Sequence, residues 1–236
     1  MKKSIASVFA AMVVMGASQL TFANSETAVA QAPAPGLVEV KNGAFQSTWA
    51  NPEVDFRQYQ RVVIAEEGAL EFRDVGHPQK SRARMLHANE RVFGVPERDR
   101  ERVGRHAGES FVKSLSRSKH YEVIDDSETE FPVKGTLILR GHMLDVVSKV
   151  PPPIAGSGAV YGNVMGEATL VIELFDAESG EMVAFVAERS NIQRSGSFDV
   201  GFVPEMNSAT AMAEVRRWAS RAGMRLAKGL DGEHKV

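Results

Sequence analysis

The sequence predicts an α+β fold in which a mostly antiparallel sheet of about five strands carries two main helices on one face. Two long stretches have apolar residues at helical spacing, and the other apolar segments are short, β-branched and bounded by turn residues. Their order along the chain is strand, helix, four strands and helix. This order differs from the regular alternation of strands and helices that is typical of a parallel sheet.

The first strand and the first helix are expected in the first half of the chain. Residues 61–65 are β-branched and apolar, as a buried strand requires, and residues 69–73 are a candidate extension of that strand. A helix is predicted over 96–118, because Pro96 suits a first helical turn and acidic residues crowd that start. Its apolar stripe recurs at every fourth residue: Val103, Ala107, Phe111 and Leu115.

Four strands are expected after the first helix. A short strand is predicted at 121–124 and a longer one at 135–147. Residues 168–175 and 182–187 are apolar on both faces, and the turn-forming stretch 176–180 lies between them. This arrangement predicts a hairpin.

The last element is predicted to be a helix from Ser208, which suits an N-cap, to about Gly229. Its apolar residues are spaced alternately by three and four positions and share one face: Met212, Val215, Ala219, Ala222 and Leu226. We expect the two helices to cover one face of the sheet, which leaves the other face to loops, a partner or water.

The amino terminus has the pattern of a secretory signal. Two lysines precede an apolar run from Ile5 to Ala17, which is too short to span about 30 Å of hydrocarbon. Cleavage sites fit after Ala23 and after Ala30, and the first lies nearer the apolar run. We therefore expect removal of residues 1–23 and a periplasmic or secreted protein. The alternative is an uncleaved membrane anchor.

The rest of the chain is interpreted as one domain. Residues 24–44 are read as a flexible lead that begins rich in Ala, Pro and Ser, 45–232 as a single α+β domain and 233–236 as a tail. With 43% hydrophobic residues, the 236-residue chain has the composition of a protein with a packed core, which excludes global disorder.

Composition also excludes several classes of function. The absence of cysteine rules out disulfides, thiolate metal sites, a cysteine nucleophile and a lipid-modified cysteine. A net charge of -2 is unlike that of a dedicated nucleic-acid binder. Charge is uneven along the chain: 12 basic and 7 acidic residues lie between Glu71 and Lys119, and 3 basic and 12 acidic residues between Glu122 and Glu188. Such asymmetry is suited to steering a charged partner.

Two long connections are the candidate working surface. If the strands from 135 to 189 pair antiparallel in sequence order, loops 149–166 and 190–207 leave the sheet at the same end. Long connections in compact domains are often functional. These two expose a candidate binding patch, although the same residues would also serve to cover the open sheet face: Ile154, Val160, Tyr161, Arg194, Phe198 and Phe202.

No catalytic, cofactor or metal motif is found. The six histidines include no pair with zinc-site spacing, and no G-x-S-x-G elbow is present. Asp125 and Asp126 are adjacent, so on a strand they point to opposite faces and do not form a facing carboxylate pair. We therefore expect no catalytic residue, no cofactor, no metal and no enzyme activity.

Four short stretches resemble a known family: Trp49-Ala50-Asn51-Pro52, Val62-Val63-Ile64, Asp176-Ala177-Glu178-Ser179-Gly180, and Arg217-Trp218-Ala219 with Arg225-Leu226. Over about residues 45–230 the chain is similar to an uncharacterised bacterial lipoprotein family, a domain of unknown function. The resemblance implies an envelope location and a compact α+β fold, and it brings no activity. This chain departs from the family because it has no lipobox cysteine.

These observations favour a non-enzymatic periplasmic interaction module whose loops 149–166 and 190–207 contact another envelope protein. The alternative is a periplasmic carrier that holds a small apolar or lipid-like ligand between the sheet and the same loops. An envelope hydrolase is the least favoured reading, because no catalytic constellation is found.

Overall fold

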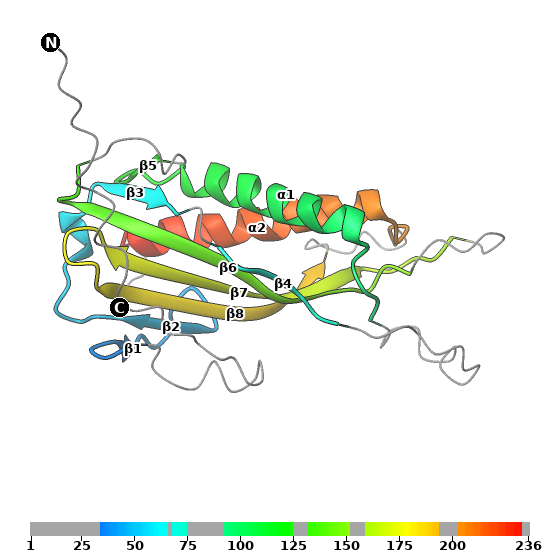
Figure 1. The fold of residues 1–236 in the computed structure, drawn as a ribbon, viewed down its shortest axis with the longest axis horizontal. Coiled ribbons are helices and arrows are strands. Elements are labelled where there is room, and N and C mark those ends of the chain that lie inside the picture. The colour runs from blue at the N-terminus through cyan, green and yellow to red at the C-terminus, as the bar shows by residue number, and fades with distance from the viewer. Residues whose placement is uncertain are drawn as a thin grey trace, which may run out of the picture.

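A computed structural model describes residues 34–65, 68–74, 92–124, 132–151, 159–193 and 203–232. Within these ranges the protein is a mixed α/β structure in which two helices lie over one face of a sheet (Figure 1). The sheet is mostly antiparallel, so the predicted α+β class is confirmed. The expected signal peptide, the first part of the lead and the expected tail lie outside the described residues.

The sheet has eight strands in the order β1-β2-β8-β7-β6-β3-β5, and β4 pairs with β6 off this path. The strands are β1 (Val38–Glu39), β2 (Ser47–Ala50), β3 (Arg61–Ile64), β4 (Leu70–Phe72), β5 (Glu122–Ile124), β6 (Thr136–Ser148), β7 (Val164–Asp176) and β8 (Met182–Gln193). The helices are α1 (Glu97–Leu115) and α2 (Ser208–Leu230), with a 3₁₀ turn η1 (Phe56–Gln58).

The long strands β6, β7 and β8 form the antiparallel centre of the sheet. The predicted hairpin at 176–180 is confirmed, because it joins β7 to β8. Asp176 caps this turn by accepting hydrogen bonds from the amides of Glu178 and Ser179, both at 2.7 Å. Gly180 has a φ of 72°, a left-handed conformation that glycine adopts without strain.

The other side of the sheet is parallel. β3 pairs with the first half of β6, and β4 with its second half, both parallel. β5 is parallel to β3, and α1 lies between these strands in the sequence. Residues 69–73 are therefore not an extension of β3 as predicted. They form a separate strand on the same edge of β6.

The predicted count of about five strands is wrong, because three short strands and two strand ends were missed. β1 lies within the segment expected to be a lead, and β2 is too short and polar to show alternation. β7 begins at Val164 instead of 168, and β8 ends at Gln193 instead of 187. These strand ends carry charged residues, such as Glu167 and Arg189, whose partners lie on other strands.

Both helices begin at the end of the sheet where β6 ends (Figure 1). Phe93, shortly before α1, forms a bridge with Ser148 at the end of β6. α1 ends at Leu115 rather than 118, and the N-cap of α2 is Asn207 rather than Ser208. The Asn207 side chain accepts a hydrogen bond from the amide of Thr210 at 2.9 Å. No described helix is both long and apolar enough to cross a membrane.

The main core lies between the helices and the sheet, where α2 contributes Val215, Ala222 and Leu226. A smaller cluster covers part of the opposite face of the sheet. It consists of Leu37, Leu144, Val171, Phe185 and Ala187, with Trp49 packed against it. The N-terminal segment and β2 therefore shield some of the face that has no helix.

The close packing of α1 against α2 gives a first prediction. A Cβ atom at Gly223 would lie 2.4 Å from the carbonyl oxygen of Phe111, whereas one at Gly108 would meet nothing within 4 Å. We expect Gly223→Ala to lower the free energy of unfolding by about 2 kcal/mol through overpacking. The control Gly108→Ala should raise it by about 1 kcal/mol through helix propensity. Urea denaturation followed by circular dichroism tests both; equal effects would contradict this packing.

Candidate functional site

The two long connections meet at one end of the sheet, as the antiparallel order predicts. Tyr161 and Glu205 form an antiparallel bridge between the first connection and the second. The amide of Met206 donates a hydrogen bond to the carbonyl oxygen of Val160 at 2.7 Å. The connections run over 149–163 and 194–207, so they are shorter than expected, but their described parts are hydrogen-bonded to each other.

Two of the six predicted patch residues can be placed. Val160 is 42% exposed and Tyr161 is 62% exposed, and both lie where the connections pair. Ile154, Arg194, Phe198 and Phe202 lie outside the described residues. Val203, which is 43% exposed, lies just before the residues that pair with the first connection. We call Val160, Tyr161 and Val203 the junction surface.

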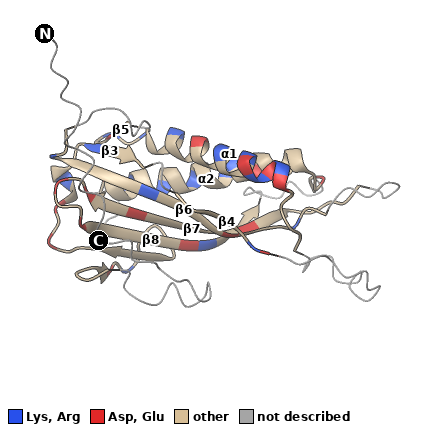
Figure 2. Ribbon diagram, viewed as in Figure 1, with Lys and Arg blue, Asp and Glu red and all other residues tan. Residues whose placement is uncertain are grey.

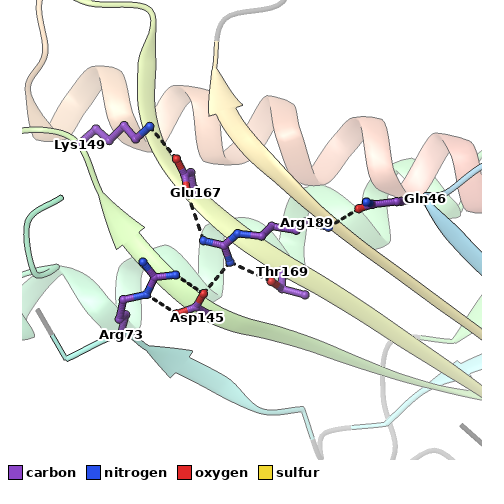
Figure 3. A network of polar contacts seen from close by, with 7 residues as sticks. All are labelled: Gln46, Arg73, Asp145, Lys149, Glu167, Thr169 and Arg189. Atoms are coloured by element: carbon purple, nitrogen blue, oxygen red, sulfur yellow. Dashed lines mark hydrogen bonds and ion pairs between the residues drawn. The ribbon is translucent and has the colours of Figure 1, made fainter. Parts of the chain in front are cut away.

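A network of charged residues lies at the same end of the sheet (Figure 3). Lys149, at the start of the first connection, lies 2.6 Å from Glu167 on β7. Arg189 on β8 joins Glu167 at 3.1 Å to Asp145 on β6 at 2.6 Å. Asp145 also accepts a hydrogen bond from Arg73 Nε at 2.6 Å, just after β4. The network therefore ties three central strands, β4 and the first connection together.

This network lies on the face of the sheet that has no helix. Side chains alternate between the two faces along a strand, so residues an even number of positions apart share a face. Glu167 is four residues from Val171 on β7, and Arg189 is two residues from Ala187 on β8. Val171 and Ala187 belong to the apolar cluster on the face without a helix. Thr169, between Glu167 and Val171, accepts a hydrogen bond from Arg189 at 3.1 Å. A register shift in β6 places Asp145 at a φ of 54°, a left-handed conformation that aspartate tolerates better than most residues.

The two carboxylates of the network remain charged at neutral pH. The hydrogen bond from Arg73 lowers the pKa of Asp145, and Arg189 adds to this effect. The hydrogen bond from Lys149 lowers the pKa of Glu167, again with help from Arg189. A carboxylate with a lowered pKa is a poor general acid, and the ion pairs of both carboxylates hold the strands together.

A second polar cluster lies further along the same face. Glu173 is only 6% exposed and has His142 at 3.4 Å and Arg140 at 3.8 Å. The amide of Ala69 donates to His142 Nδ1 at 3.0 Å, so the ring hydrogen is on Nε2, which faces Glu173. His142 thereby links the start of β4 to β7 across β6.

The acidic stretch from 122 to 188 does not form a free acidic surface among its described residues. Its strand carboxylates are paired with cations from other parts of the chain: Asp145 with Arg73 and Arg189, Glu167 with Arg189, and Glu188 with Arg225. Figure 2 shows Lys and Arg on α1 and α2 above a sheet that carries acidic residues. Folding therefore neutralises the strand carboxylates of this stretch, whereas Glu178 and Glu181 in the turn between β7 and β8 are exposed and 125–130 lie outside the described residues.

In the part of the chain that the structure describes, no group of three or more His, Cys, Asp or Glu side chains could hold a metal ion. Asp125, Asp126 and Ser157 lie outside that part. The expected lack of a catalytic centre stays a prediction.

The sequence analysis missed the charged network, although a signal for it exists. Residues 168–175 were read as apolar on both faces, yet Thr169 and Glu173 share one face with Glu167. A polar residue at every second position of an apolar strand indicates one polar face. The partners Arg73 and Arg189 lie too far away in the sequence for any local pattern to identify them.

No protein-family model matches the sequence, and no curated protein matches it either. Several solved structures are similar in fold. A neuraminyllactose-binding hemagglutinin homologue from Helicobacter pylori is 14% identical, with a TM-score of 0.33 over 77% of this chain and 86% of that one. The PelC dodecamer from Paraburkholderia phytofirmans is 12% identical, with a TM-score of 0.33 over 70% of this chain and 88% of that one.

The protein XCC0632 from Xanthomonas campestris, of family DUF330, is 11% identical to this chain, with a TM-score of 0.38 over 78% of this chain and 91% of that one. One similar structure therefore comes from an uncharacterised domain family, but no sequence match supports the lipoprotein family that the chain resembles. At these TM-scores the similarities carry no argument about function.

The charged network predicts a pH dependence of stability. A carboxylate whose folded pKa lies below its unfolded value of 3.8 stabilises the protein above that value, and this contribution is lost as the pH falls through the folded pKa. Asp145→Asn keeps the left-handed backbone but removes the charge, so we expect it to lower the free energy of unfolding by about 2 kcal/mol at neutral pH.

Chemical denaturation at neutral pH and at about pH 3 tests this, and the variant should lose less stability on acidification than the unmodified protein. Glu178→Gln, at an exposed position of the hairpin turn, is the matched control and should change little. Identical losses on acidification for Asp145→Asn and the unmodified protein would show that Asp145 contributes no stabilising charge.

Proposed function

We propose that this chain is an exported, non-enzymatic interaction module of the cell envelope that binds another envelope protein through the junction surface. Export rests on the signal pattern of residues 1–23. The binding surface comprises the described parts of loops 149–166 and 190–207, together with the neighbouring patch residues of the same loops. The partner is a protein whose contact surface is apolar at its centre.

One observation carries this proposal: two connections from different strands pair with each other and still expose apolar side chains. Three of the seven large apolar residues that are exposed in the described chain form the junction surface. A fourth, Val92, lies next to Phe93, which pairs with the end of β6 at the same end of the sheet. Apolar side chains gathered at one end of a domain are typical of a binding site.

The charged network supports the same proposal because it joins β6, β7, β8 and the start of the first connection at this end. Lys149 holds the first connection to β7, and Asn207 caps α2 where the second connection ends. A surface whose backbone is fixed before binding loses less conformational entropy when a partner arrives. The paired, ionised carboxylates Asp145 and Glu167 favour this structural role over catalysis.

In the carrier alternative, a small apolar or lipid-like ligand lies between the sheet and the same two loops. The space between the helices and the sheet is occupied by the main core, which leaves the loop side as the place for a small ligand. Native mass spectrometry of gently purified protein distinguishes the two functions. A stoichiometric small molecule that leaves on unfolding supports carriage, whereas bare protein mass supports a protein partner.

Substitution of the junction surface tests the proposal. We expect Tyr161→Ser and Val203→Ser to weaken capture of the partner from envelope extract by at least about tenfold, because central apolar contacts dominate most interfaces. Phe198→Ser and Phe202→Ser extend the test to the rest of the patch. Val38→Ser is the control, since Val38 is 56% exposed on β1 at the far edge of the sheet.

A photo-crosslinking residue at position 161 identifies the captured protein, and the same residue at position 38 measures background. Circular dichroism and thermal unfolding establish that each variant is folded. If folded variants with Tyr161→Ser and Val203→Ser retain the partner at full strength, the junction surface is not the binding site.

A further inference from the structure

Beyond Ala187, the outer edge of β8 has no strand partner among the residues that the structure describes. β2 pairs with β8 only from Ala184 to Ala187. Beyond that point, the amide of Arg189 donates to the side chain of Gln46 at 3.3 Å, and no described strand pairs with 190–193 on this side. An unpaired strand edge presents backbone donors and acceptors to which another extended chain can bind.

The direction of these backbone groups follows from the register. The amide and carbonyl of a strand residue point to the same side, and this side alternates along the strand. Asn51 donates to the carbonyl oxygen of Val183, so the odd-numbered residues point away from β7. Asn191 therefore presents its amide and carbonyl outward, and it is exposed. The carbonyl oxygen of Gln193 points the same way.

A row of arginines on α2 lies above this edge. Arg225 pairs with Glu188 at 2.6 Å, and Arg217 is paired with the buried Glu214. Arg221, between them, donates to the carbonyl oxygen of Gln193 at 3.4 Å and has no carboxylate partner among the described residues. The charges of Arg217 and Arg225 act unfavourably on Arg221 and that of Glu214 acts favourably, but Glu214 is already bound by Arg217. A carboxylate brought close to Arg221 would therefore add a favourable charge.

A second contact between an arginine of α2 and nearby backbone lies one turn further along the helix. Arg225 donates to the carbonyl oxygen of Ala44 at 3.3 Å and lies over the ring of Phe45 at 4.6 Å. Ala44 and Phe45 belong to the chain that approaches the edge of β8 just before β2. An arginine of α2 thus contacts the bent backbone that leads into β2 beside β8, and Arg221 contacts the backbone at the end of β8 in a similar way.

We propose that the β8 edge site, defined as the backbone of 189–193 together with Arg221, binds an extended segment of a partner protein that carries an acidic side chain. The segment would add to the sheet as a strand and direct its carboxylate toward α2. Backbone hydrogen bonds supply affinity in this mode of recognition, and the charge supplies selectivity.

Other occupants fit the edge less well. A lipid headgroup or a free anion would satisfy Arg221 but leave the outward amide of Asn191 without a peptide acceptor. A second copy of this chain fits less well, because the described carboxylate on this part of β8, Glu188, is already bound by its own Arg225. A partner with an extended acidic segment meets both requirements.

This inference does not depend on the junction surface, because it uses the backbone of β8 and an arginine of α2. The two proposals can therefore fail separately. Tyr161→Ser should leave the β8 edge site intact, and Arg221→Gln should leave the junction surface intact.

A peptide of about ten residues in which valine alternates with glutamate is the probe, because alternation places all carboxylates on one face of a strand. Fluorescence anisotropy measures its binding to the chain that lacks residues 1–23. We expect Arg221→Gln to weaken binding by about tenfold, as expected for loss of one charge-assisted hydrogen bond. Arg105→Gln, an exposed cation on α1, is the control and should bind as the unmodified protein does.

Two further probes separate strand addition from simple charge attraction. A peptide with lysine in place of glutamate should not bind, and a peptide methylated on alternate backbone nitrogens should bind at least about tenfold more weakly. Amide exchange of Asn191, followed by nuclear magnetic resonance, should slow when the glutamate peptide binds.

Equal binding of the methylated peptide would overturn the proposal, because it would show that backbone pairing is not involved. Binding of the lysine peptide, unchanged binding to Arg221→Gln, or no binding of the glutamate peptide at all would each overturn it as well.

Discussion

The antiparallel register of β6, β7 and β8 is the constraint on which the proposed binding end of this protein depends. Because each strand reverses the direction of the one before, the end of β6, the start of β7 and the end of β8 lie together. Both long connections therefore meet at this end, and the charged network spans the same three strands. A slip of one residue would turn the network toward the core, so its charges also favour the observed register.

Charge in this fold serves first to join segments that are distant in the sequence. The carboxylates of the long strands receive cations from the β4 side, from the first connection and from α2. Partly buried carboxylates need such partners, because an unpaired charge away from water is costly. Arg221 differs from its neighbours on α2. Arg217 and Arg225 are paired with carboxylates, whereas Arg221 donates a hydrogen bond to the carbonyl oxygen of Gln193.

The parts of the fold that could be predicted from the sequence are those in which apolar residues recur at the spacing of a helix or a strand. α1, α2 and the centres of β6, β7 and β8 show this spacing, and the meeting of the two connections follows from their order. β1 and β2 are short, and the polar end of β8 at Arg189 depends on partners far along the chain, so no local pattern identifies them. The pattern of 69–73 does predict a strand, but it does not show that β4 is separate from β3 and pairs with the second half of β6. The edge of β8 that lacks a described partner strand could not be predicted either, because it begins where β2 stops pairing with β8, at Ala187.

The two proposed sites, the junction surface and the β8 edge site, would have complementary physical roles in binding. Strand addition uses backbone groups that every peptide has, so by itself it gives affinity with little selectivity. Apolar side chains such as Tyr161 discriminate by shape, and Arg221 discriminates by charge. β8 ends at Gln193, where the second connection begins, so a segment added to its edge lies beside the end of the sheet at which the connections meet. One partner that contacts both surfaces would gain from each through effective concentration, without either contact being strong alone.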